Sequence, residues 1–296
     1  MNKKNGTYIM LAVALTTLTS MMYFFSLEST IQTDSEQQNI PIEDIVTTQD
    51  GCDLHYWFYD QDTEFVIVYL HGGPGSNSSA VRGAFGNEFS SKWGSILFYD
   101  QRGSGESCAS SDAYFTFETA VDDLKTAVNR VAPEKDIILW GHSFGAMILV
   151  ANATSVAGVD AVAYVFDAPW LNQELTIQTR EALGENAFME TEREHELMNA
   201  YKTDKSRSET SRAWYENEQL NDVDLIPSLE SISQPTLVLY GMFDTNVPPG
   251  QVEEMKKHLQ ATYIPFSTGG HNFMFAFSEE YLSAMMTFLQ ENGLSK

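Results

Sequence analysis

Short apolar segments alternate with segments of helical periodicity along most of this sequence, and this alternation limits the possible folds more than any other feature. The clearest helical segment starts at Phe117, keeps its apolar residues at helical spacing through Val131, and ends before Pro133. Such alternation is typical of an α/β fold, in which a mostly parallel sheet carries helices on both faces. We predict eight strands, at residues 42–48, 53–59, 65–70, 95–99, 137–140, 161–166, 236–240 and 262–264.

Two regions depart from this alternation. The first two predicted strands are joined through Asp50 and Gly51, a pair that predicts a hairpin turn. Between Pro169 and Gln234 no strand pattern is visible, and charged or polar helical segments predominate. We therefore expect a core formed by residues 41–168 and 235–296, with residues 169–234 inserted as a helical cap that covers a site at the strand ends.

The first thirty residues differ in character from the rest of the chain. Lys3 and Lys4 precede a run without charge at residues 8–27, long enough to span a bilayer and also compatible with a signal-peptide core. No Ala-x-Ala cleavage site follows, so we expect residues 1–30 to be an uncleaved signal anchor, with a cleaved signal peptide or a buried core helix as the alternatives. Residues 31–40 are predicted to be a linker. Lysines on the cytoplasmic side would place the remaining chain on the periplasmic or extracellular side of the membrane.

The net charge of the chain limits the classes of molecule that it is expected to bind. The chain has 41 acidic residues against 17 Lys and Arg, a formal net charge of -24. Such a protein repels phosphate backbones and anionic lipid headgroups, so we expect no nucleic-acid partner. Cationic ligands are favoured, although the excess of acid can equally serve solubility alone. The spacing of the cysteines contains no CxxC motif, so we expect no metal site, and no cofactor is predicted.

The chemistry of the chain centres on Ser143. The segment Gly141-His142-Ser143-Phe144-Gly145 lies between a short apolar strand and an apolar helical run, which is the strand-turn-helix context of a nucleophile elbow. The sharp turn brings backbones close together, so it requires small neighbours. The serine hydroxyl would then stand at the amino end of the helix, where an oxyanion is stabilised.

A serine needs a base to remove its proton, and the base needs an acid to orient it. Asp244 follows the strand predicted at 236–240, and His271 lies in a glycine-flanked loop after the last strand. The order Ser143, Asp244, His271 matches the order of this kind of triad along the chain. Asp167, which also follows a strand, is the alternative acid.

The other histidines are expected to be structural or solvated. His142 is expected to point away from the serine, and His71 to support its own loop; the remaining ones are His55, His195 and His258.

An oxyanion hole requires two backbone amides directed at one point. One comes from the residue after the nucleophile, here Phe144. The second is expected from Gly73, in the loop His71 to Gly75 that directly follows the strand at 65–70.

These motifs together resemble the proline iminopeptidase group of α/β-hydrolases, over about residues 41–168 and 235–296. The resemblance rests on His-Gly-Gly-Pro-Gly at 71–75, on Asp-Gln-Arg-Gly-Ser-Gly-Glu-Ser at 100–107, and on the order Ser143, Asp244, His271. It implies an α/β-hydrolase fold and removal of an amino-terminal residue, often proline, from a peptide. It also implies that Asp100 and Arg102 pair to stabilise their loop. The chain departs from the family pattern at Phe144, Ala146 and Thr245, positions that bear on the preference for proline.

In that group, carboxylates of the cap bind the free amine of the substrate. Glu216 and Glu218 combine acid with neighbouring aromatic surface and are therefore the candidates here, although a solvated helix face explains each of them as well.

Two cysteines, Cys52 and Cys108, complete the set of reactive groups. In this fold the second strand runs antiparallel beside the fourth, so Cys52 and Cys108 would lie close together. A disulfide is feasible in an oxidising compartment, and two unrelated free thiols are the alternative.

The sequence thus predicts a serine hydrolase that forms an acyl-enzyme from a small peptide or other small molecule, most simply an aminopeptidase. A carboxylesterase acting on small esters is the alternative within enzymes. A third possibility is an anchored binding protein that keeps the fold without activity.

Overall fold

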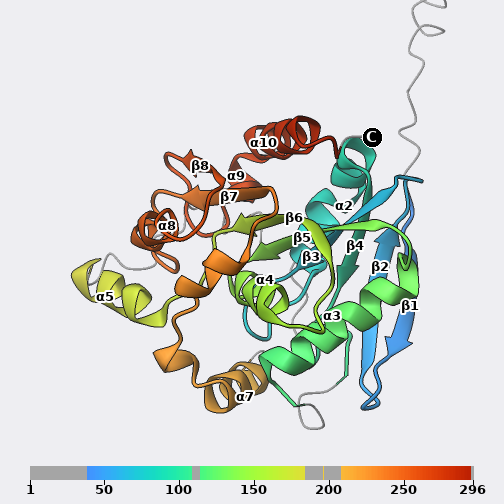
Figure 1. The fold of residues 1–296 in the computed structure, drawn as a ribbon, viewed down its shortest axis with the longest axis horizontal. Coiled ribbons are helices and arrows are strands. Elements are labelled where there is room, and N and C mark those ends of the chain that lie inside the picture. The colour runs from blue at the N-terminus through green and yellow to red at the C-terminus, as the bar shows by residue number, and fades with distance from the viewer. Residues whose placement is uncertain (1–38, 109–113, 184–195, 197–207, 295–296) are drawn as a thin grey trace, which may run out of the picture. The chain divides into compact units, whose positions relative to one another are not determined.

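The computed structural model describes residues 39–108, 114–183, 196 and 208–294 (Figure 1). The predicted anchor at 1–30, most of the predicted linker at 31–40, His195 and part of the predicted cap lie outside these residues. The predictions for those segments stay predictions. Among the described residues, no helix combines the length and the apolar character needed to cross a membrane.

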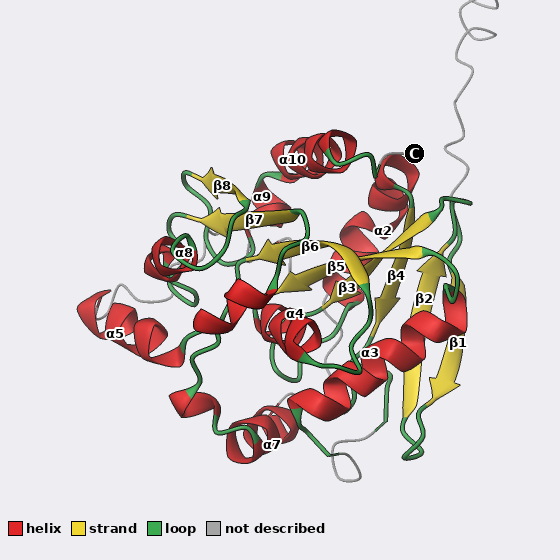
Figure 2. Ribbon diagram, viewed as in Figure 1, coloured by secondary structure: helices red, strands yellow, loops and turns green. Residues whose placement is uncertain are grey.

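One sheet organises the described chain. It has eight strands in the order β1-β2-β4-β3-β5-β6-β7-β8, and it does not close into a barrel (Figure 2). β2 pairs antiparallel with both β1 and β4, and every other neighbouring pair is parallel. The strands are β1 (Ile42–Thr47), β2 (Asp53–Tyr59), β3 (Phe65–Leu70), β4 (Ser95–Tyr99), β5 (Asp136–His142), β6 (Ala161–Asp167), β7 (Thr236–Gly241) and β8 (Thr262–Phe266). The predicted α/β-hydrolase fold is confirmed.

The clearest difference from the predicted strands is at β5, which continues through Gly141 to His142. Glycine is a weak strand residue, so the apolar pattern alone places the end at Trp140. In the structure, Gly141 pairs with Leu70 of β3, and His142 pairs with Asp167 of β6. Pairing on both sides therefore extends the strand to the residue before the nucleophile.

Strand side chains alternate between two apolar layers, as the pleat of a strand requires. In β3, Val66 and Val68 join the layer under α3 and α4, whereas Ile67 and Tyr69 join the layer under α2 and α10. The helices of these layers are α2 (Ser79–Trp93), α3 (Phe117–Val131), α4 (Phe144–Thr154), α8 (Pro249–Met255), α9 (Phe273–Ala276) and α10 (Ser278–Glu291) (Figure 1).

The described part of the insertion between β6 and β7 is helical, as predicted. It contains α5 (Gln173–Leu183), α7 (Ser208–Asn217) and two short 3-10 helices, η3 (Leu220–Asp222) and η4 (Pro227–Ser231). Gln251 of α8, fully buried, ties the start of this insertion to the core. Its Oε1 accepts from the amides of Leu171 and Asn172, and its Nε2 donates to Thr176 Oγ1 at 3.0 Å.

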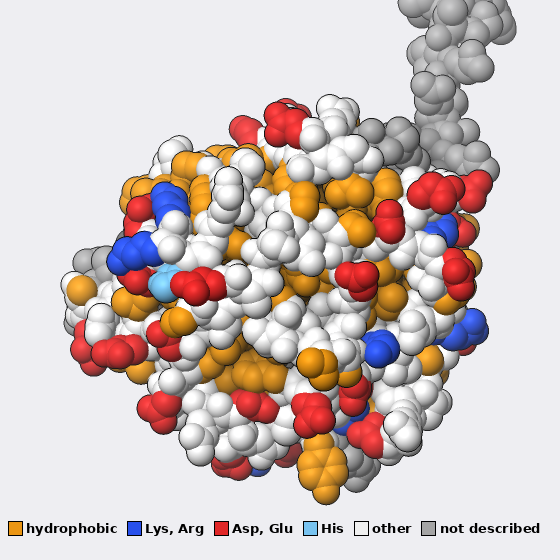
Figure 3. Space-filling model, in the orientation of Figure 1, with side chains coloured by type: hydrophobic (Ala, Val, Ile, Leu, Met, Phe, Trp, Pro, Cys, Tyr) orange, Lys and Arg blue, Asp and Glu red, His pale blue; other side chains and the backbone are white. Residues whose placement is uncertain are grey.

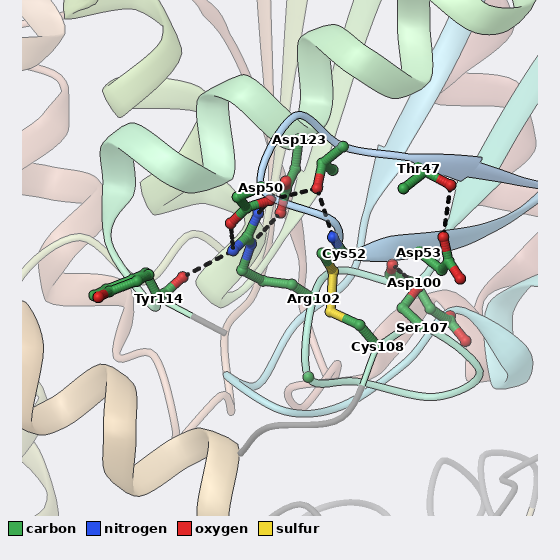
Figure 4. Close-up of a disulfide and its surroundings, with 12 residues drawn as sticks. Thr47, Asp50, Cys52, Asp53, Asp100, Arg102, Ser107, Cys108, Tyr114 and Asp123 are labelled. Atoms are coloured by element: carbon green, nitrogen blue, oxygen red, sulfur yellow. Dashed lines mark hydrogen bonds and ion pairs between the residues drawn. A yellow bond between two sulfur atoms is a disulfide. The ribbon is translucent and has the colours of Figure 1, made fainter. Parts of the chain in front are cut away.

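A disulfide joins Cys52, directly before β2, to Cys108 in the loop after β4 (Figure 4). The antiparallel pairing of β2 with β4 brings the two residues together, with their Cα atoms 5.3 Å apart. A backbone bond from Cys108 N to Asp53 O, 2.8 Å, adds to this connection. Of the two alternatives that the sequence leaves open, the structure contains the bridge.

The predicted pairing of Asp100 with Arg102 is wrong. Asp100 accepts hydrogen bonds from the amide and hydroxyl of Ser78, both at 2.8 Å, and from the amide of Glu106. Arg102 points the other way, toward α3 and the β1–β2 turn (Figure 4). Its guanidinium binds Asp123 through two bonds of 2.6 Å and reaches Asp50 at 2.9 Å. Asp100 therefore connects its loop to Ser78, whereas Arg102 connects the same loop to α3 and to the β1–β2 turn.

The buried guanidinium of Arg102 and the carboxylates that bind it shift one another's pKa values. Burial alone would lower the pKa of Arg102, but its hydrogen bonds to Asp123 and Asp50 outweigh that effect and raise the pKa. The hydrogen bond from Arg102, together with one from Thr48, keeps the pKa of Asp50 well below its usual range. Burial raises the pKa of Asp123, although the hydrogen bond from Arg102 opposes this effect. The network links the β1–β2 turn, the 100–107 loop and α3.

Candidate active site

The turn between β5 and α4 holds Ser143 in a conformation that few side chains adopt. Ser143 has φ 53° and ψ -114°, so its backbone lies in the left-handed half of conformational space. A Cβ on Gly145 would lie 2.2 Å from the carbonyl oxygen of Leu70, so only glycine fits there. The Ser143 amide donates to Asp167 O, and the Ser143 carbonyl accepts from Trp170 N. These contacts hold a strained nucleophile elbow at the strand ends.

Three side chains from three distant segments meet at this turn. His271 Nε2 lies 3.0 Å from Ser143 Oγ, and His271 Nδ1 lies 2.8 Å from Asp244 Oδ2. A carboxylate only accepts, so Nδ1 carries the proton and Nε2 is the acceptor for the serine hydroxyl. This tautomer is the one a general base needs.

The position of Asp244 follows from the loop after β7. Its Oδ1 accepts from the amides of Asn246 and Val247, both at 2.8 Å, which leaves Oδ2 for the histidine. A Cβ on Gly241 would lie 2.3 Å from Gly270 O, so the end of β7 and the loop of His271 touch backbone to backbone. Asp244 is itself buried, which excludes water from the bond to the imidazole.

Asp167, the alternative acid, has other partners. Its Oδ2 accepts from Tyr281 OH at 3.0 Å and lies 3.2 Å from His142 Nδ1, and its side chain is buried. His142 does not contact the serine through this nitrogen, but its ring lines the pocket and lies 5.0 Å from the ring of His271. Asp244 is the carboxylate that bonds the imidazole.

The loop after β3 packs directly against the nucleophile. A Cβ on Gly72 would lie 3.1 Å from the Cβ of Ser143. His71 stiffens this loop: its Nδ1 donates to Gly72 O at 2.8 Å, and its Nε2 accepts from Gln101 N at 3.0 Å. Among the described residues, no backbone bond engages the Gly73 amide. Phe144 is the first residue of α4, where helical amides lack an acceptor within the helix.

A cavity of about 300 Å³ opens above the triad. Aromatic rings form much of its wall, with polar groups between them. Ser143 and His271 form its base; Tyr69, Trp170, Gln173, Tyr215 and Phe275 are among the walls. None of the described residues that line it is Asp, Glu, Lys or Arg. The wall is therefore suited to a small and largely uncharged group.

The two cap acids are not brought to this cavity. Neither Glu216 nor Glu218 is among its described lining residues, although Tyr215 is. Glu216 is exposed, and Glu218 Oε1 accepts from the Phe117 amide at 2.8 Å, at the first residue of α3. The described structure thus provides a capping contact for Glu218.

Trp170 and Gln173 in the cavity wall are not predicted from the sequence, because neither belongs to a recognisable motif. Their position directly after the predicted strand at 161–166 is the only signal that could have pointed to them. Among the histidines expected to be structural, His55 stacks on Trp57 and lies 3.2 Å from Glu43, and His258 lies 2.8 Å from Glu230.

Comparison with known proteins identifies the family. A family model described as serine aminopeptidase, S33, matches residues 61–275. The proline iminopeptidase of Thermoplasma volcanium is 23% identical over 265 residues, covering 76% of this chain and 89% of that protein. That of Saccharolobus solfataricus is 30% identical over 105 residues, and the match spans only 33% of its length. A match to protein phosphatase methylesterase 1 of Candida albicans, 34% identical over 91 residues, spans 24% of that protein.

Solved structures agree on the fold. The proline iminopeptidase-related protein of Thermus thermophilus superposes with a TM-score of 0.69 at 22% identity, covering 84% of this chain and 97% of that one. An esterase of Exiguobacterium antarcticum gives a TM-score of 0.65 at 16% identity, covering 84% of this chain and 100% of that one. On the strength of the family match over most of its core, this chain belongs to the S33 serine aminopeptidase family of α/β-hydrolases.

Proposed function

We propose that this protein is a serine hydrolase that cleaves an amide or ester bond through an acyl-enzyme. Ser143 Oγ attacks the carbonyl carbon while His271 Nε2 takes the serine proton. Asp244 orients the imidazole and stabilises the imidazolium that forms. The amides of Gly73 and Phe144 bind the oxyanion, and the protonated His271 then gives its proton to the leaving group. Water repeats the sequence on the acyl-enzyme and restores the serine.

The continuous chain of hydrogen bonds from Ser143 through His271 to Asp244 carries this proposal, with distances of 3.0 and 2.8 Å. A fluorophosphonate probe, which reacts with activated serines, tests it. We expect the probe to label the wild-type protein and to leave Ser143→Ala unlabelled, while circular dichroism shows that both are folded. Equal labelling of the two proteins would remove Ser143 from the proposal.

Within this class we propose an aminopeptidase of the proline iminopeptidase type, acting on the amino-terminal residue of a peptide. The family match and the proline iminopeptidase relatives support this substrate class. Such an enzyme requires a free amine, so an aminoacyl p-nitroanilide should be cleaved far faster than its N-acetylated form. Proline and alanine derivatives compared in the same assay report the preference for proline.

A carboxylesterase is the second candidate, and one observation favours it. A cationic amine in a partly desolvated pocket needs a counter-charge, and no described lining residue is a carboxylate. Under this alternative, p-nitrophenyl esters of short acids are hydrolysed rapidly, and acetylation of an amine leaves the rate unchanged. The same substrate panel therefore separates the two candidates.

A further inference from the structure

The wall of the active-site cavity contains a buried glutamine whose amide group has a determined orientation. Gln173, the first residue of α5, lines the cavity and is only 6% exposed. Trp170 Nε1 lies 3.1 Å from Gln173 Oε1. The indole nitrogen can only donate, so the oxygen of the amide must face Trp170. The Gln173 Nε2 group is thereby directed away from Trp170.

Within the described part of the chain, this Nε2 group has no hydrogen-bond acceptor. No described residue accepts a hydrogen bond from it, whereas the Gln173 amide nitrogen of the backbone donates to Val223 O. Fully enclosed polar atoms without a partner occur among the described residues at five side chains, and Gln173 is not one of them. Its Nε2 therefore keeps some accessible surface although the residue is buried, and the cavity is the space that Gln173 lines. A ligand that fills the cavity would cover this donor, and covering it without an acceptor is unfavourable, so a ligand that supplies an acceptor is favoured.

Charge decides which acceptor is favoured. A carboxylate or phosphate would enter a protein with a net charge of -24, and no Lys or Arg among the described lining residues would neutralise it. An ammonium group is a donor and cannot pair with Nε2. An uncharged carbonyl oxygen satisfies both conditions.

We propose that Gln173 determines substrate specificity by donating a hydrogen bond to a second, uncharged carbonyl oxygen of the substrate. The scissile carbonyl itself is assigned to the Gly73 and Phe144 amides, so this inference rests on the proposed function. The substrate class is accordingly an ester or amide with another neutral carbonyl group nearby, such as the next peptide bond of a peptide or a keto group of an acyl chain.

Two pairs of matched esters test this in the full-length protein. In the first pair the acyl group differs: p-nitrophenyl 4-oxopentanoate against 4-methylpentanoate, in which a methyl group replaces the oxygen. In the second pair the alcohol differs: 2-oxopropyl butanoate against 2-methylpropyl butanoate, followed by acid release. The variants are Gln173→Leu, which removes the donor, and Gln173→Glu, which keeps an acceptor for Trp170 and presents an oxygen to the cavity. Gln178→Leu is the matched control, an exposed glutamine of the same helix that bonds Glu174.

We expect Gln173→Leu and Gln173→Glu to lower kcat/KM about tenfold for the carbonyl member of one pair, the loss expected for one hydrogen bond. An effect of the altered Trp170 contact should fall on both members of a pair alike, so the ratio of their kcat/KM values reports the donor. Circular dichroism shows that the variants are folded, and Gln178→Leu should change neither member. If both members of both pairs fall equally in Gln173→Leu, or none changes, the inference is overturned.

NMR measures the binding of the same esters to Ser143→Ala, with and without Gln173→Leu. This measurement does not depend on turnover. A selective loss of affinity for the carbonyl member is expected there too, and equal affinities would overturn the inference. Hydrolysis that persists in Ser143→Ala contradicts the proposed function instead, so the two failures are distinguishable.

Discussion

At the scale of single residues, the two carboxylates at the ends of β6 and β7 have different surroundings although both are buried. Asp244 Oδ2 bonds His271, whereas Asp167 Oδ2 accepts from Tyr281 and lies beside His142. The sequence predicts Asp244 as the acid and leaves Asp167 as the alternative, because each follows a strand. Only the direction of the side chains separates them.

We predict that Asp244→Asn lowers kcat by about 10⁴-fold, because the amide favours the wrong tautomer of His271. Asp167→Asn should lower it by less than about tenfold, since the amide oxygen can still accept from Tyr281. Steady-state kinetics on a substrate that the wild type cleaves measures both variants. A larger loss in Asp167→Asn than in Asp244→Asn would reverse the assignment of the acid.

At the scale of elements, the cap and the core are joined through the start of α3. Thr116 caps this helix through the amide of Thr119, and Glu218, which follows α7, accepts from the amide of Phe117. A carboxylate at a helix amino terminus also interacts favourably with the helix dipole. The contact therefore gives Glu218 a stabilising role that the sequence does not indicate.

We expect Glu218→Ala to reduce the free energy of unfolding by about 1 kcal/mol, as the loss of a capping contact does. Glu216→Ala, at an exposed neighbouring position, should leave the stability unchanged. Thermal or urea unfolding of both variants measures this difference. The opposite pattern, an unchanged stability in Glu218→Ala with a tenfold higher KM for free-amine substrates alone, would return Glu218 to amine binding.

At the scale of the whole molecule, the acidic side chains are spread over the face seen in Figure 3 rather than gathered into one patch. Besides the sheet and the Arg102 network, the disulfide connects two residues that are 56 positions apart in the chain. A bridge of this span restricts the unfolded chain and therefore favours the folded one.

We predict that the double variant Cys52→Ala, Cys108→Ala loses about 4 kcal/mol of unfolding free energy, from the chain entropy of a loop of this length. Urea unfolding of wild type and variant measures the loss, with added reductant as a control that should affect the wild type only. Identical midpoints and slopes for wild type and variant in the absence of reductant would contradict a stabilising bridge.

The sequence by itself determined the strands, their mostly parallel arrangement, and the residues Ser143, Asp244 and His271 as candidates. The reason is local: apolar runs bury on both faces of a parallel sheet, and the chemistry follows where strands end. Tertiary structure alone decided the partners of long side chains, because Arg102 can reach Asp123 and Asp50 as readily as Asp100 until packing sets its direction. It likewise decided that Gln173 lies in the cavity wall with no acceptor for its side-chain donor among the described residues, because this depends on where the start of α5 lies relative to the triad.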